Sequence, residues 1–99
     1  MRVILSPQAS VEIDEILAFI ARDNPAAAVR YVAGMRKKIR SLGRFPRIHP
    51  IRDDLPGELR SAVYGSHLIL FRIGERTVDV ARVVHGARDL PSLFGESGG

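Results

Sequence analysis

The sequence predicts an α+β fold in which a helical hairpin packs on a mainly antiparallel four-stranded sheet. Two observations carry this prediction. Between Ser6 and Gly43, apolar residues recur at three- and four-residue steps, the spacing of amphipathic helices. Between Leu59 and Val84, runs rich in Val, Ile, Leu and Phe alternate with short turns, which indicates strands. A chain of 99 residues holds one hydrophobic core, so we expect a single domain over residues 1–94.

The first half of the chain carries two helix start signals. Residues 2–5 form a short strand that stops at Ser6-Pro7, where Ser caps a helix and Pro suits its first position. Asn24-Pro25 repeats this signal after a short loop, so a second, antiparallel helix should end near Gly43. The first helix buries a stripe of four residues: Ile13, Ile16, Leu17 and Ile20.

The second half is predicted to form a meander. Residues 45–57 are rich in Pro, Gly, Asp and Arg without period, so we expect an irregular surface loop. The segments 59–63, 67–73 and 77–84 then follow as antiparallel strands, because only short turns separate them. The strand at residues 3–5 must join an edge of this sheet to avoid standing alone.

Composition limits the function classes. The chain has no cysteine, which excludes disulfides and thiolate metal sites, and a reducing cytoplasm is the easiest fit. It shows no export signal and no apolar run long enough to span a bilayer, so we expect a cytoplasmic protein that does not engage a membrane. A net charge of +4 and a pI near 10.3 favour acidic partners, although such charge also serves solubility alone.

Chemistry-bearing residues are few. The histidines at 49, 67 and 85 share no metal-binding spacing, and no phosphate loop or nucleophile elbow is present, so we expect no metal, no cofactor and no catalytic residue. A candidate target-binding set remains on and after the predicted meander: Arg60, Arg72, Arg82, His85, Arg88 and Asp89. Arg72 and Arg82 are expected to point away from the helices and to form a basic patch with Arg60.

Alternative interpretations stand beside these candidates. Exposed sheet positions commonly carry long polar side chains without binding anything. His67 and His85 can titrate near neutrality, but a histidine at a strand end more often bonds to backbone. Asp89 is interpreted first as the cap of a short turn over residues 89–93.

The order of elements and several short segments resemble ParE-type toxins. These segments are Ser6-Pro7, the run from Ile20 to Ala28, Phe45-Pro46-Arg47 and the ending from Arg82 to Leu90. The similarity spans about residues 3–90 and implies the RelE/ParE fold. It also implies a toxin encoded with a neutralising ParD-like antitoxin, which inhibits DNA gyrase by binding and leaves broken DNA. Operator DNA would be contacted only through the antitoxin, within a hetero-oligomer.

The same fold serves RelE-type ribosome-dependent messenger-RNA endonucleases, so the fold alone does not choose the activity. Where that family usually has an arginine that holds phosphate, this sequence has Leu68, and no tyrosine follows His85. Both departures favour the ParE branch and a non-enzymatic inhibitor. The alternatives are a RelE-like nuclease and a non-toxic antitoxin-binding corepressor.

Two surfaces are therefore predicted. An apolar groove beside the helical hairpin should hold the antitoxin, with Val11, Phe19, Tyr31 and Met35 as its lining. The toxic surface should lie at the chain end, unless Leu90, Leu93 and Phe94 simply fold back and close the core. The polar segment 95–99 is expected to be a disordered tail.

Overall fold

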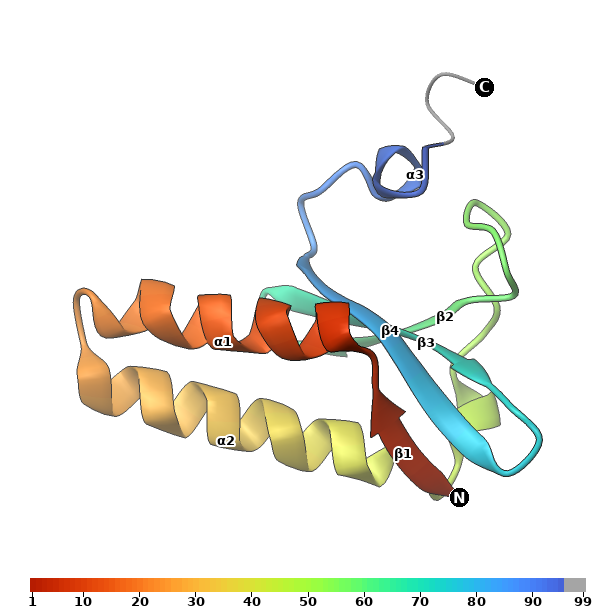
Figure 1. The fold of residues 1–99 in the computed structure, drawn as a ribbon, viewed down its shortest axis with the longest axis horizontal. Helices are drawn as coiled ribbons and strands as arrows, with labels where there is room; N and C mark the ends of the chain where they lie inside the picture. Colours follow the sequence, from red (N-terminus) through yellow and green to blue (C-terminus); the bar gives the residue numbers. More distant parts are fainter. Residues whose placement is uncertain (96–99) are drawn as a thin grey trace.

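Two antiparallel helices cover one face of a four-stranded sheet (Figure 1). This arrangement is seen in a computed structural model that describes residues 1–95. The main elements are β1 (Arg2–Leu5), α1 (Pro7–Ala21), α2 (Pro25–Ser41), β2 (Arg60–Tyr64), β3 (His67–Ile73) and β4 (Thr77–His85). The predicted α+β class and the identity of every main element are confirmed.

Both helices begin where the sequence signals predict. The Ser6 side chain accepts a hydrogen bond from the Ala9 N–H over 2.9 Å, and the Asn24 side chain accepts one from Ala27 over 3.0 Å. Proline follows each cap at the first helical position. Each cap satisfies a backbone donor that the helix leaves unpaired, which fixes where the helix starts.

The sheet has the strand order β1-β4-β3-β2 and is mixed. β2, β3 and β4 form the predicted antiparallel meander, and β1 joins its edge parallel to β4. β1 pairs only with the first half of β4, from Thr77 to Val80. The second half of β4 therefore lacks a neighbouring strand on that side, and α1 packs beside it.

The core is divided between the two faces of the sheet. On the helix side, Ile13, Met35 and Phe71 belong to the larger cluster of fully buried residues. On the other side, a smaller cluster forms around Leu70 and Val84. It is completed by Leu55, Leu59 and Leu90, with Leu93 and Phe94 packed against it.

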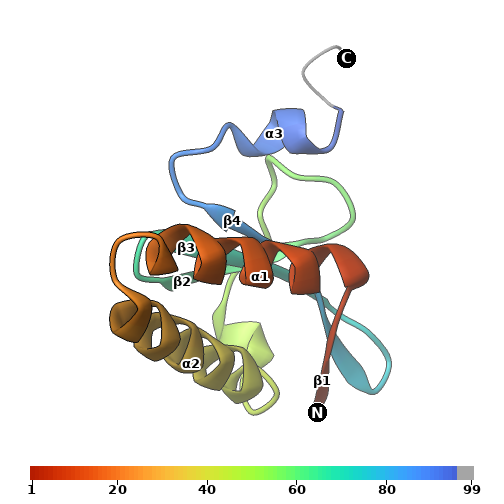
Figure 2. The same cartoon turned by 60° about the vertical axis from the view of Figure 1, so that its left-hand side comes forward.

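The segment after β4 returns to the sheet. The short helix α3 (Leu90–Leu93) lies beside the loop that precedes β2, on the face opposite α1 and α2 (Figure 2). The fold-back alternative for Leu90 and its neighbours is thus what the structure shows. The expected cap differs, because the Asp89 side chain makes no capping bond and Ser92 Oγ instead donates to the Asp89 carbonyl over 2.8 Å.

The structure bears only in part on the predictions for the loop at 45–57 and the segment 95–99. The loop at 45–57 is more regular than predicted, since it contains the short 3-10 helix η1 (Pro46–Ile48) and Ile51 forms a bridge with Arg60. Of the expected disordered tail, residues 96–99 lie outside the described range. Among residues 1–95, no helix has the length and apolar character needed to cross a bilayer.

Candidate functional site

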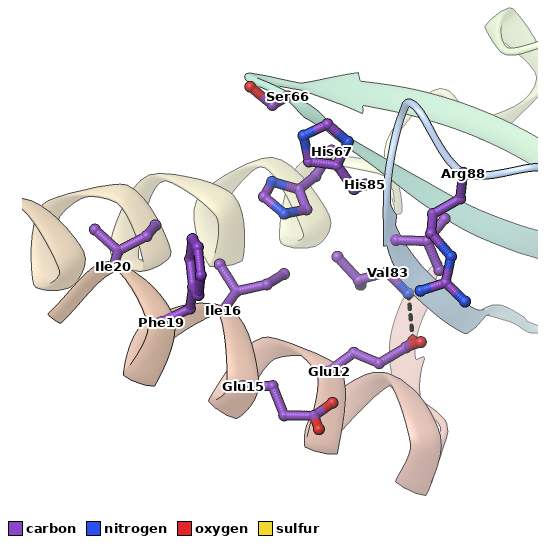
Figure 3. Close-up of a pocket in the computed structure, with 11 residues that line it drawn as sticks. Glu12, Glu15, Ile16, Phe19, Ile20, Ser66, His67, Val83, His85 and Arg88 are labelled. Carbon is purple, nitrogen blue, oxygen red and sulfur yellow. Dashed lines mark hydrogen bonds between the residues drawn. The ribbon is translucent and has the colours of Figure 1, made fainter. Parts of the chain in front are cut away.

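An open cleft of about 480 Å³ lies between α1 and the second half of β4 (Figure 3). α1 supplies its apolar wall through Ile16, Phe19 and Ile20. The opposite side carries His85, at the end of β4, and Arg88, in the segment that follows. Phe19 is exposed, with 69% of its surface accessible. We call this surface the α1–β4 cleft.

Glu12 lines the cleft and accepts a backbone hydrogen bond from the edge of β4 that has no neighbouring strand. Only 8% of its surface is exposed, and its Oε1 accepts the Val83 backbone N–H over 2.8 Å. Its Oε2 accepts from Arg82 Nε and Nη2 over 2.9 and 2.7 Å. A buried backbone donor and a buried carboxylate would each be costly alone. Together with Arg82 they compensate one another and fasten α1 to the open edge of β4.

A histidine pair lies at the far side of the cleft. The rings of His67 and His85 meet edge to face, with centroids 5.5 Å apart. Tyr31 Oη is 2.7 Å from His67 Nδ1, which joins α2 to the start of β3. Burial, and then the nearby His85, lower the pKa of His67. His67 is therefore biased toward its neutral form near neutral pH.

Tyr31 is also held from two other directions. The Tyr64 hydroxyl donates to the Tyr31 carbonyl over 3.0 Å, and the Ser66 N–H donates to the Tyr31 hydroxyl over 3.3 Å. At the β2–β3 turn, Gly65 has a φ of 54°, and a Cβ there would lie 2.5 Å from the Tyr31 hydroxyl. Glycine is thus needed both for the turn and for the approach of Tyr31. Tyr31 does not line the cleft but contacts His67 and Ser66, which do.

The comparison with known families decides the identity. Residues 3–90, which include all the residues of this cleft, match the family described as the ParE toxin of the type II toxin–antitoxin system parDE. This chain belongs to the ParE toxin family.

Relatives of known name support the assignment. The chain is 32% identical over 91 residues to Toxin ParE1 of Mycobacterium tuberculosis, from both the CDC 1551 and the H37Rv strains. Each alignment covers 90% of this chain and 93% of the relative. A solved structure of the chromosomal ParDE system from P. aeruginosa superposes with a TM-score of 0.74 at 17% identity. It covers 86% of this chain and 95% of that one, and it confirms the predicted fold.

In this ParE-family chain, the cleft unites residues from both predicted surfaces. Phe19, expected to bind antitoxin, faces the same cleft as His85 and Arg88, expected to bind the target. Val11 is 51% exposed on α1 but does not line the cleft, and neither does Asp89. Met35 is fully buried in the core, so its expected place in a surface groove is wrong. Met35 lies in the apolar stripe of α2, a position that is typical of a core residue.

The expected single basic patch does not form. Arg82 is paired with Glu12, whereas Arg60 and Arg72 line a different cleft at the other end of β3. A register shift between Leu70 and Phe71 leaves Ala81 without a cross-strand partner. Arg82 pairs with Leu70, whereas Arg72 lies opposite Asp79, two positions further along β3. The buried Glu12 then provides Arg82 with its partner.

Glu12 is the residue that sequence reasoning missed as part of the site. Its early place in α1 suggested only a favourable interaction with the helix dipole. The available signal was its spacing, because Glu12 follows Ala9 by three residues and precedes Ile16 by four, within the buried stripe. A carboxylate at such a position requires a partner across the interface.

Proposed function

We propose that this ParE-family toxin inhibits DNA gyrase by direct binding and that a ParD-like antitoxin neutralises it by covering the α1–β4 cleft. The observation that carries the proposal is the joint presence of Phe19, His85 and Arg88 in one cleft. An exposed aromatic side chain beside a cation is typical of an anchoring contact in protein interfaces. A partner seated on Phe19 would also shield Arg88, which gives neutralisation a physical basis.

Binding is favoured over RNA cleavage by the environment of the polar groups. Cleavage requires cations free to hold the scissile phosphate and groups free to move protons. Arg82 is occupied by Glu12, and the Tyr31 and Tyr64 hydroxyls are engaged by the chain itself. Leu68, in the place of the nuclease arginine, packs against the smaller core cluster. These contacts support an inhibitor that acts through its surface.

The direct experiment combines purified gyrase, plasmid DNA and the purified toxin. We expect linear, gyrase-linked DNA to accumulate and to disappear when the protein encoded by a neighbouring short reading frame is added. A parallel reaction on translating ribosomes tests the nuclease alternative by primer extension. Specific messenger cuts without gyrase–DNA cleavage would overturn the gyrase proposal. Absence of both activities, with antitoxin binding intact, would instead support the corepressor alternative.

Antitoxin binding should depend on the aromatic anchor of the cleft. Replacing Phe19 with Asp places a charge in the apolar wall, so the affinity for the antitoxin should fall by at least about 2 kcal/mol, or roughly thirtyfold. Val29→Asp is the matched control, because Val29 is 64% exposed on α2 and lies outside the cleft. Titration calorimetry would measure both. Equal losses in the two variants would place the antitoxin elsewhere.

A further inference from the structure

A second cleft, of about 250 Å³, lies where β2 begins and β3 ends. Three arginines from different parts of the chain line it: Arg47 from η1, Arg60 from β2 and Arg72 from β3. Glu58 supplies its only carboxylate. We call this group the arginine cleft. The strand β3 separates it from His67 and the α1–β4 cleft by roughly 20 Å, given about 3.3 Å per residue.

Two of these arginines are held in place by backbone. Arg60 Nη1 donates to the His49 carbonyl over 2.7 Å, and Arg72 Nε donates to the Gly57 carbonyl over 3.0 Å. Gly57 has a φ of 75°, and a Cβ there would lie 2.5 Å from Arg72 Nη2. Glycine thus lets the guanidinium lie against the chain. Each arginine keeps further N–H donors for a ligand while its side chain is already ordered.

The positive charge of the three arginines in this cleft is offset only in part, by the single carboxylate of Glu58. In the part of the chain that the structure describes, the only ion pairs are Arg52–Asp54 and Arg82–Glu12. Glu58 lies in the cleft yet forms no ion pair with its arginines. The pKa of His49 is lowered by burial and then by the positive charges of Lys38 and Arg60. Guanidinium groups that line one cleft and form no ion pair attract phosphate, to which Arg binds through paired hydrogen bonds.

We infer that Arg47, Arg60 and Arg72 form a binding site for the phosphodiester backbone of duplex DNA. This site would let the toxin contact nucleic acid directly, without the antitoxin and without gyrase. The inference goes beyond gyrase inhibition and does not depend on it. The net charge of +4 gives such contact a favourable long-range attraction, while the arginine cleft gives it a defined place.

Fluorescence anisotropy of a short labelled DNA duplex, with the antitoxin-free toxin, tests the site. Loss of one phosphate contact should weaken binding roughly five- to tenfold at 0.1 M salt and reduce the slope of log K against log salt by about 0.9. Arg47→Gln and Arg72→Gln should both show this change. Glu58→Gln should tighten binding, because it removes the one opposing charge in the cleft.

Arg36→Gln is the matched control, since Arg36 is exposed on α2 and lines neither cleft. Its substitution removes the same charge and should leave the slope unchanged. Equal weakening by all three arginine variants would overturn the site and leave only diffuse attraction. Polyglutamate that competes as well as DNA, or inorganic phosphate that binds where DNA does not, would also contradict a phosphodiester site. Because gyrase is absent, failure here would not affect the proposed gyrase inhibition.

Discussion

Glu12 attaches α1 to β4 through hydrogen bonds to Arg82 and Val83. It compensates the charge of Arg82 and the Val83 N–H at once, and the two charged side chains are only 10% and 20% exposed. Glu12→Ala would leave both groups without a partner, so it should lower the free energy of unfolding by about 3–5 kcal/mol. Glu12→Gln should cost less, because its amide oxygen can still accept from Val83. Urea denaturation measures both changes.

Glu15→Ala provides the control for this prediction. Glu15 is exposed one turn further along α1, and its loss should change stability by no more than about 0.5 kcal/mol. If Glu12→Ala cost no more than Glu15→Ala, the attachment of α1 would rest on apolar packing alone.

His67 should make stability depend on pH. Burial and His85 lower its pKa below the usual 6.5, so the unfolded chain binds protons more readily than the folded chain. Stability should therefore be full above pH 6.5 and fall as the pH drops through 6.5 toward the lower folded-state pKa. His49, which is lowered in the same direction, contributes a similar loss. In His67→Gln, the fall in melting temperature on acidification should be shallower than in the wild type. An identical pH profile would contradict a lowered pKa of the half-buried His67.

The sequence predicts contacts between residues that are close along the chain well, and contacts between distant residues poorly. Ser6 and Asn24 were predictable caps because each bonds to a residue three positions later. The pairing of Glu12 with Arg82 spans 70 residues and depends on the end of β1, so no local pattern marks it.

The segment after β4 contains one residue that packs in the core and one that is exposed at the surface. Leu90 is only 5% exposed and belongs to the smaller core cluster, whereas Arg88 is exposed two residues earlier. Leu90→Ala should cost about 2–5 kcal/mol of stability, because it leaves a cavity in that cluster. Arg88→Glu should change stability by at most about 0.5 kcal/mol. Thermal denaturation of the two variants checks the contrast. A negligible effect of Leu90→Ala would mean that the segment does not close the core.

Helices and strands were predictable because their periods are local, as the meander from β2 to β4 shows. We could predict that β1 joins an edge of the sheet, because a single short strand is not stable alone. Its parallel pairing with β4, and the choice of that edge, depend on how the helical hairpin crosses the sheet. The packing of α3 was left open for the same reason, since apolar residues after a strand can cover either face.

For the whole molecule, the predicted target-binding set separates into different environments. Arg82 is fixed within the fold, His85 and Arg88 line the α1–β4 cleft, and Arg60 and Arg72 line the arginine cleft. The sequence indicated which residues carry charge but not their grouping, because a register shift and a short edge strand decide it. The two clefts therefore lie apart, and we propose that one binds a protein and the other binds phosphate.

We propose that the toxic contact with gyrase is made through the α1–β4 cleft. The most direct measurement is gyrase-mediated DNA cleavage titrated with Arg88→Glu, alongside Arg36→Glu as a charge-matched control outside the cleft. We expect Arg88→Glu to stay folded and to lose most of its ability to trap cleaved DNA, while Arg36→Glu retains it. Full potency of folded Arg88→Glu would contradict the claim.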